Sequence, residues 1–242
     1  MAKLVYRFQF PDGRTELLQV RPVVPAERGA DLPAWTALGF HQCANCPLST
    51  ADTPHCPMAV GLVPLVELFD KVRSYDEVTA QVESEERTVT KRTSVQRVLR
   101  SLMGLLAASS DCPRIEFLKP MAHYHLPFST QEETTYRVVS TYLLSQYFLR
   151  QQGKAADAGL GGLKANYREL QQVNAKMAAR LGAVKVEGGD SSVNALVLLD
   201  VFAQSLPESI DQALEELQPA FQKLLPASPP SRPMPSRSGP SA

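Results

Sequence analysis

The four cysteines of this chain constrain its fold more than any other feature. They follow a C-x2-C-x9-C-x55-C spacing, and the last three are each followed directly by proline. Four thiolates are the ligand set of an all-cysteine zinc site or of an iron–sulfur cluster. The spacing therefore predicts one metal site, which ties a short loop to a distant segment, with the ligands Cys43, Cys46, Cys56 and Cys112.

The spacing leaves the occupant of this site open between iron–sulfur and zinc. Cys43 and Cys46 form a C-x2-C turn of the kind that zinc knuckles use. Cys56 and Cys112 arrive singly and precede proline, as does the last ligand of the bacterial ferredoxin motif. A third interpretation is that all four are reduced thiols, packed as small hydrophobic side chains without a metal.

The four histidines supply alternative ligands or neighbours of the metal. His41 and His55 flank the cysteine loop, and either can replace Cys112 as a fourth zinc ligand. His123 and His125 lie on one side of the chain if their segment is extended, which suits a second metal or an acid–base pair. The simpler interpretation is that these imidazoles are ordinary hydrogen-bonded side chains.

The charge balance argues against binding to nucleic acid. Lysine plus arginine and aspartate plus glutamate each total 25, so the chain has no overall basic footprint. One weak basic group lies just downstream of several glutamates, and we expect a solvated surface with internal ion pairs there. This group consists of Arg87, Lys91, Arg92, Arg97 and Arg100.

The hydropathy pattern points to a cytoplasmic protein. No segment approaches the ~18 uninterrupted apolar residues of a membrane helix, and the N-terminal residues lack the apolar core of a signal peptide. In a reducing compartment, cysteines are more often metal ligands than disulfides. Membrane association is not expected.

The periodicity predicts an α+β fold, in which a small N-terminal antiparallel β element packs on a mainly helical body. A hairpin turns at Pro11-Asp12-Gly13, and two further strands follow within 75–90. Helices are predicted over 58–72, 95–108, 130–152 and 163–181, and two separate ones over 193–204 and 208–225. Capping boxes are predicted at Thr93 with Gln96 and at Ser129 with Glu132.

We expect a single domain over 1–225. It has a β-rich part (1–92) that contains the cysteine loop (41–57), and a helical part (93–225). The segment 226–242 consists mainly of serine, proline and arginine, and this composition predicts a disordered tail.

Three motifs carry a resemblance to a known family. They are residues 40–48 (FHQCANCPL), residues 55–59 (HCPMA) and residues 118–127 (LKPMAHYHLP). At these motifs the chain resembles a family of uncharacterised bacterial proteins that is defined as a domain of unknown function, over roughly the first 180 residues. The resemblance implies a bacterial cytosolic protein and brings no activity, cofactor or catalytic residue with it.

Three functional hypotheses follow. The first is a metal-binding protein with a structural or redox-sensing site that acts through a protein partner. The second is a redox enzyme or electron carrier whose iron–sulfur cluster is chemically active, with His123 and His125 near the substrate. The third is a metal-free interaction module. The chain contains no P-loop, no G-x-S-x-G, no G-x-G-x-x-G and no H-E-x-x-H motif, so no catalytic residue is predicted.

Overall fold

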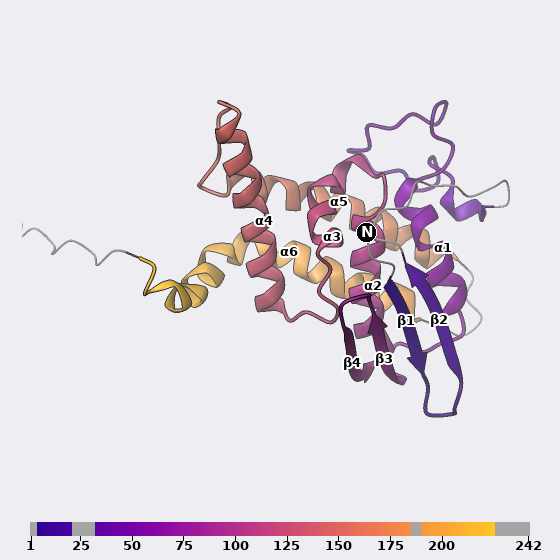
Figure 1. The fold of residues 1–242 in the computed structure, drawn as a ribbon. Coiled ribbons are helices and arrows are strands. Elements are labelled where there is room, and N and C mark those ends of the chain that lie inside the picture. Colours follow the sequence, from indigo (N-terminus) through magenta and orange to yellow (C-terminus); the bar gives the residue numbers. More distant parts are fainter. Residues whose placement is uncertain (1–3, 21–31, 185–189, 226–242) are drawn as a thin grey trace, which may run out of the picture.

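The N-terminal part of the chain forms a four-stranded antiparallel sheet. The computed structural model describes residues 4–20, 32–184 and 190–225. The hairpin β1 (Leu4–Gln9) and β2 (Thr15–Val20) forms as predicted. β3 (Glu77–Glu83) pairs with β1, and β4 (Thr88–Ser94) pairs with β3, giving the strand order β2-β1-β3-β4 (Figure 1).

One face of this sheet is buried against helices. Alternate side chains of β1 (Leu4, Tyr6 and Phe8) and of β3 (Val78, Ala80 and Val82) are buried. This alternation is what a strand with one face on the core requires. The ring of Phe8 meets the ring of Phe69, just after α1, edge to face at 5.0 Å between centroids.

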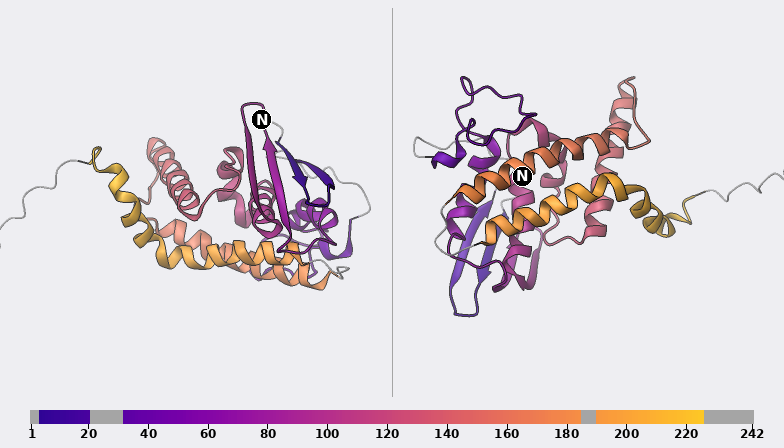
Figure 2. Two further views of the ribbon diagram at one scale, coloured as in Figure 1. Left: turned by 90° about the horizontal axis from the view of Figure 1, so that it is seen from below. Right: turned by 180° about the vertical axis from the view of Figure 1, so that it is seen from behind.

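The helical body lies behind the sheet. α1 and α2 contact the strands, and α5 and α6 pack side by side on the opposite side of α2 (Figure 2). The helices are η1 (Ala34–Thr36), α1 (Pro57–Leu68), α2 (Val95–Ala108), η2 (Pro113–Leu118), α3 (Lys119–His123), α4 (Gln131–Gln151), α5 (Gly161–Ala183), α6 (Ser191–Leu217) and η3 (Gln218–Phe221). The predicted α+β architecture is confirmed.

The C-terminal part of the body is one helix where the sequence predicted two. Pro207 lies inside α6 and does not end it. Proline has no N–H, so the carbonyl of Ala203, four residues earlier, loses its helical hydrogen bond. The side-chain amide of Gln171 on α5 donates to that carbonyl at 3.0 Å. A neighbouring helix thus supplies the missing donor, and α6 continues through the proline.

The capping box of α4 lies one residue later than predicted. Thr130, not Ser129, is the N-cap, and the N–H of Glu133 donates to its hydroxyl at 3.1 Å. In return, the N–H of Thr130 donates to the Glu133 carboxylate at 2.7 Å. The predicted partner Glu132 still lies in the first turn, where its charge favours the helix dipole.

The capping box predicted at Thr93 and Gln96 is wrong. β4 runs through Thr93, the N-cap of α2 is Ser94, and no side chain caps this helix. Backbone carbonyls take over this role. The N–H of Val95 donates to Asp76 at 2.9 Å, and the N–H of Gln96 donates to Ser74 at 3.0 Å. Strand and helix therefore follow each other without a loop.

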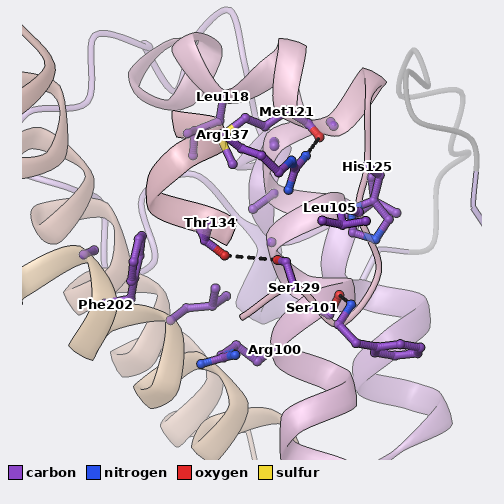
Figure 3. Close-up of a pocket in the computed structure, with 18 of the residues that line it drawn as sticks. Arg100, Ser101, Leu105, Leu118, Met121, His125, Ser129, Thr134, Arg137 and Phe202 are labelled. Atoms are coloured by element: carbon purple, nitrogen blue, oxygen red, sulfur yellow. Dashed lines mark hydrogen bonds between the residues drawn. The ribbon is translucent and has the colours of Figure 1, made fainter. Parts of the chain in front are cut away.

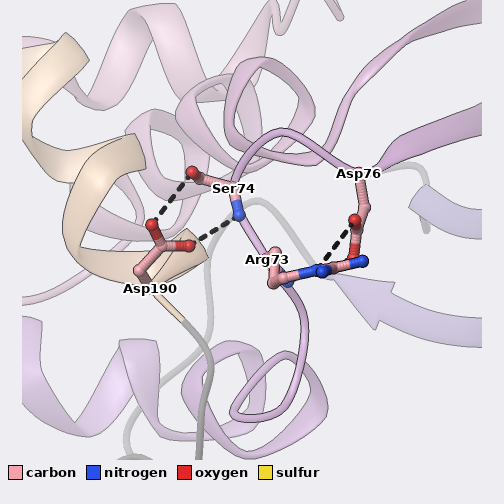
Figure 4. Close-up of polar contacts among 4 residues, drawn as sticks. All are labelled: Arg73, Ser74, Asp76 and Asp190. Carbon is pink, nitrogen blue, oxygen red and sulfur yellow. Dashed lines mark hydrogen bonds and ion pairs between the residues drawn. The ribbon is translucent and has the colours of Figure 1, made fainter.

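The segment around Ser74 also holds the start of α6. The carboxylate of Asp190 accepts hydrogen bonds from the N–H (2.7 Å) and the hydroxyl (3.1 Å) of Ser74 (Figure 4). Arg73 and Asp76 form an ion pair beside them at 3.2 Å. One short connection thus anchors the starts of both α2 and α6.

The remaining predictions on organisation have mixed outcomes. The segment between α2 and α4, for which the sequence predicted no helix, contains η2 and α3. The tail 226–242 lies outside the described residues. Across the part of the chain that the structure describes, no helix is long and apolar enough to cross a membrane.

Candidate metal centre

The cysteine loop is closed at its base by backbone pairing. The N–H of Leu38 donates to the carbonyl of Pro54 at 2.8 Å, and the N–H of Cys56 donates to Thr36 at 2.7 Å. Ala37 and His55 form an antiparallel bridge between these two bonds. The two ends of the loop therefore lie side by side, and Cys56 faces the beginning of the segment that carries Cys43 and Cys46.

The Cys-Pro pairs have a structural explanation. Cys56 is the N-cap of α1 and Cys112 is the N-cap of η2, so Pro57 and Pro113 occupy the first helical turn. Proline suits this position, because the N–H that it lacks would have no helical partner there. Each of these cysteines thus lies at a helix start, in the extended conformation that precedes the helix.

The four thiols are neighbours. Burial, followed by the nearby thiols of Cys56 and Cys46, raises the pKa of Cys43 to about 11. Burial likewise raises the pKa of Cys112 to about 11, with further contributions from Cys56, Cys43 and Cys46. Since charges affect one another only over a limited range, the thiols of three separate segments lie within electrostatic range of one another. All four are free thiols, with no disulfide among them.

The convergent thiols lie in a largely buried position. Cys56 and Cys112 are each 8% exposed, while Cys43 and Cys46 are half-buried. Within residues 4–20, 32–184 and 190–225, no group of three or more His, Cys, Asp or Glu side chains is arranged so that it could hold a metal ion. The four thiols therefore do not form an assembled metal site in this structure.

A polar clamp joins the fourth cysteine to the C-x2-C turn. The Arg114 guanidinium, two residues after Cys112, donates from Nε to the carbonyl of Asn45, which lies between Cys43 and Cys46. Glu169 on α5 accepts a hydrogen bond from the Asn45 amide at 2.7 Å and pairs with Arg114 at 3.7 Å. The backbone N–H of Arg114 also bonds to Cys112, which favours the thiolate.

A buried arginine holds the start of the loop. Arg180 on α5 is 1% exposed, and its guanidinium donates to the carbonyls of Trp35 (2.7 Å), Ala37 (2.7 Å) and Leu38 (2.9 Å). Its charge also lowers the pKa of Cys43, against the stronger effect of burial. Among the described residues, no carboxylate forms an ion pair with it. The positive charge of Arg180 therefore faces the thiols without an acidic partner.

The two histidines that flank the loop have different surroundings. The ring nitrogen Nδ1 of His55 is hydrogen bonded to the Thr36 hydroxyl at 2.8 Å, at the base of the loop. His41 is exposed, has a positive φ of 48° and lies edge to face against the ring of Phe40. His55 therefore supports the loop base, while His41 lies on its surface.

The other two histidines do not form the pair that an extended segment would give. His123 ends α3 and is exposed beside Tyr124, so the chain turns between the two imidazoles. His125 points into the protein, where its Nε2 is hydrogen bonded to the hydroxyl of Tyr6 at 2.6 Å. The imidazoles thus lie in different environments, one in solvent and one against the sheet.

Burial of His125 predicts a pH-dependent stability. Burial, and secondarily the charge of Arg137, lowers the pKa of His125 to about 4, below its usual value of 6.5. Between these two pH values the unfolded chain binds a proton that the folded protein does not. The free energy of unfolding is therefore expected to fall by about 2 kcal/mol from pH 7 to pH 5 on account of this residue.

Urea unfolding at pH 7 and pH 5 measures this dependence. His125→Gln removes the titrating group and is expected to show a smaller loss of stability than the wild type over the same interval. His123→Gln, which changes an exposed imidazole two residues away, serves as the control and is expected to behave as the wild type does. An equal loss in all three proteins would contradict this assignment.

The predicted basic group divides into two parts. Arg92 on β4 pairs with Glu77 on β3, as expected for a solvated surface with internal ion pairs, and Arg87 lies in the turn before β4. Lys91, Arg97 and Arg100 instead line a cavity between α2 and the helices that face it.

Sequence reasoning missed the polar residues that hold the cysteine loop. Arg114, Asn45 and Glu169 come from three segments, and no local pattern relates them. Arg180 carried a usable signal, because it lies on the apolar stripe of α5 beside Met177 and Leu181. A charged residue on a buried face is expected to have a specific partner.

Comparison with known families confirms the resemblance to an uncharacterised domain family. The family described as a domain of unknown function (DUF6901) matches residues 4–222, so the chain belongs to this family. No curated protein and no solved structure shows significant similarity to this chain.

Proposed function

We propose that this protein binds an iron–sulfur cluster through Cys43, Cys46, Cys56 and Cys112, in a structural or redox-sensing role. The observation that carries the proposal is that four free thiols from three separate segments are neighbours in a largely buried place. A chance set of cysteines would have no reason to gather in this way, whereas a shared metal centre requires it.

The two candidate occupants, a single zinc ion and an iron–sulfur cluster, differ in how far apart they hold the thiolates. A zinc ion draws four sulfurs to ~2.3 Å from one point. The iron and sulfide atoms of a cluster hold the ligand sulfurs farther apart, because each thiolate binds a different iron in the four-iron type. The proline after Cys56 and after Cys112, which also follows the last ligand of the bacterial ferredoxin motif, is the feature that favours the cluster.

The charges around the thiols support an anionic occupant. A cluster with four thiolates is negatively charged, and burial makes that charge costly unless a cation compensates it. Arg180 supplies a buried positive charge next to Cys43. Arg114 supplies a backbone N–H to the Cys112 sulfur, and hydrogen bonds to ligand sulfurs tune the reduction potential of clusters.

The position of the cluster suggests a redox-sensing role. Cys43 and Cys46 are half-buried, so oxidants can reach one side of the site. The loop between 39 and 53 contains no helix or strand, so the metal would order much of it. Loss of an oxidised cluster would release this loop. The resulting change in the surface of the protein would then signal oxidation to a partner.

A protein partner fits the exposed apolar surface of α4. The C-terminal half of this helix projects from the body (Figure 1) and exposes four large side chains, namely Leu143, Leu144, Tyr147 and Phe148. A contiguous exposed apolar patch often marks an interaction surface, whereas apolar side chains scattered singly over a surface do not. We propose that the partner through which the protein acts contacts this helix.

The variant Cys46→Ser tests the metal site, with Asp52→Ser as a matched control in the same loop. Asp52 is exposed, so its replacement leaves the thiols intact. After anaerobic purification, Cys46→Ser is expected to lose the broad absorption at roughly 400 nm that thiolate-bound iron gives. Asp52→Ser is expected to retain it. Equal metal content in both variants would contradict the proposal.

A further inference from the structure

A cavity of about 430 Å³ lies between three helices, α2, α5 and α6, and the segment that runs from η2 to the start of α4 (Figure 3). A cavity of this volume falls in the range that small organic ligands occupy. Its walls are largely apolar and come from all of these elements. The apolar side chains include Met58, Leu105, Ile115, Leu118, Met121 and Phe202.

Two buried polar side chains of α5 face this cavity. Tyr167 is 3% exposed and Asn174 is 4% exposed, and both line the cavity. Within the described parts of the chain, neither side chain has a hydrogen-bond partner. They lie seven residues apart, two turns along the same face of the helix. Their polar atoms are open to the cavity, so a ligand inside it can hydrogen bond to both.

The charged residues of the cavity are all cations. Lys91, Arg97, Arg100 and Arg137 line it, and no aspartate or glutamate of the described residues does. Arg100 is half-buried, and burial followed by the charge of Arg97 lowers its pKa. No carboxylate among the described residues pairs with Arg100. A partly buried, uncompensated cation attracts an anion.

Arg137 adds a second, positioned cation. Its Nη2 donates to the carbonyls of Met121 (2.9 Å) and Tyr124 (2.8 Å), which fixes the guanidinium at the cavity wall. A guanidinium has five N–H donors, so donors remain for a ligand. Glu133, the carboxylate that acts on the pKa of Arg137, is held in the capping box with Thr130.

We propose that this cavity binds a small organic anion with an apolar body. Arg100 neutralises the anionic group, a carboxylate or a phosphate, and the apolar walls cover the body of the ligand. The buried Tyr167 hydroxyl and Asn174 amide hydrogen bond to the polar atoms of the ligand. The inference concerns a different site from the cysteine cluster and does not depend on the metal.

Isothermal titration calorimetry of the full chain tests this inference with three ligands of equal chain length. Decanoate and decyl phosphate carry the two candidate anionic groups, and decanol carries neither. At least one anion is expected to bind about tenfold or more tightly than decanol, since charge-assisted hydrogen bonds to arginine require the negative charge. The tighter of the two anions identifies the preferred group. Equal affinity for decanol, or no binding of either anion, would overturn the inference.

Two variants locate the binding. Arg100→Gln is expected to weaken the tighter anion about tenfold or more, and the exposed Arg168→Gln on α5 is the control with the same change. Gly104→Phe is expected to abolish binding, because a side chain at Gly104 would start 3.7 Å from Leu199 at the cavity wall. Thermal unfolding verifies that each variant is folded. Unchanged affinity in a folded Arg100→Gln would refute the site.

Discussion

Replacing Arg180 with methionine is expected to lower the free energy of unfolding by about 3–5 kcal/mol. The guanidinium is 1% exposed and satisfies three backbone carbonyls, those of Trp35, Ala37 and Leu38. Methionine fills much of the same volume but offers no donor. Three acceptors are then left in the protein interior without partners, at the point where the cysteine loop begins.

Urea unfolding of Arg180→Met against Arg168→Met measures this effect. Both residues lie on α5, but Arg168 is exposed, and its replacement is expected to change stability by less than about 0.5 kcal/mol. Arg180→Lys is expected to recover only part of the loss. The compact ammonium group of lysine lacks the planar fork of donors with which the guanidinium reaches three carbonyls. Equal stability of the two methionine variants would show that Arg180 does not hold the loop.

Replacing Cys112 with serine is expected to remove the metal as completely as replacing a cysteine of the loop. Cys112 is far from the other three cysteines in sequence, yet the thiols of Cys56, Cys43 and Cys46 all act on its pKa. Arg114 ties its segment to Asn45 in the loop. If the four thiols form one site, the loss of any one ligand opens it to solvent.

Metal content and absorption after anaerobic purification measure the effect, with Ser110→Ala as the control. Ser110 lies two residues before Cys112, and its hydroxyl donates to the carbonyl of Ala107 at 2.7 Å, so its replacement tests a local disturbance without removing a thiol. Full metal content in Cys112→Ser would instead assign the fourth ligand to another group. His55→Ala and His41→Ala would then identify it.

The sheet could be predicted because its signal is local. The alternation of Leu4, Tyr6 and Phe8 and the Pro-Asp-Gly turn specify the hairpin without reference to the rest of the chain. The continuous α6 could not be predicted in this way. Its passage through Pro207 depends on a donor from Gln171 on another helix, and such tertiary compensation leaves no mark on the local sequence.

For the candidate metal centre, the four-cysteine ligand set stays a prediction, and the residues that hold the loop could not be predicted. Cysteine count and spacing pointed to Cys112 as the distant member, whose thiol lies beside the other three. The Arg114–Glu169–Asn45 clamp arises only when η2, α5 and the loop meet. The cavity was partly foreseeable, since Asn174 is a polar residue on the apolar stripe of α5.

Iron, acid-labile sulfide and zinc in the anaerobically purified wild-type protein test the central claim most directly. The account predicts iron and sulfide in stoichiometric amounts, and a brown protein that absorbs at roughly 400 nm. Stoichiometric zinc in a colourless protein would contradict the cluster while leaving a four-cysteine site in place. A protein that contains neither metal, and whose stability is unchanged in Cys46→Ser, would contradict the metal site itself.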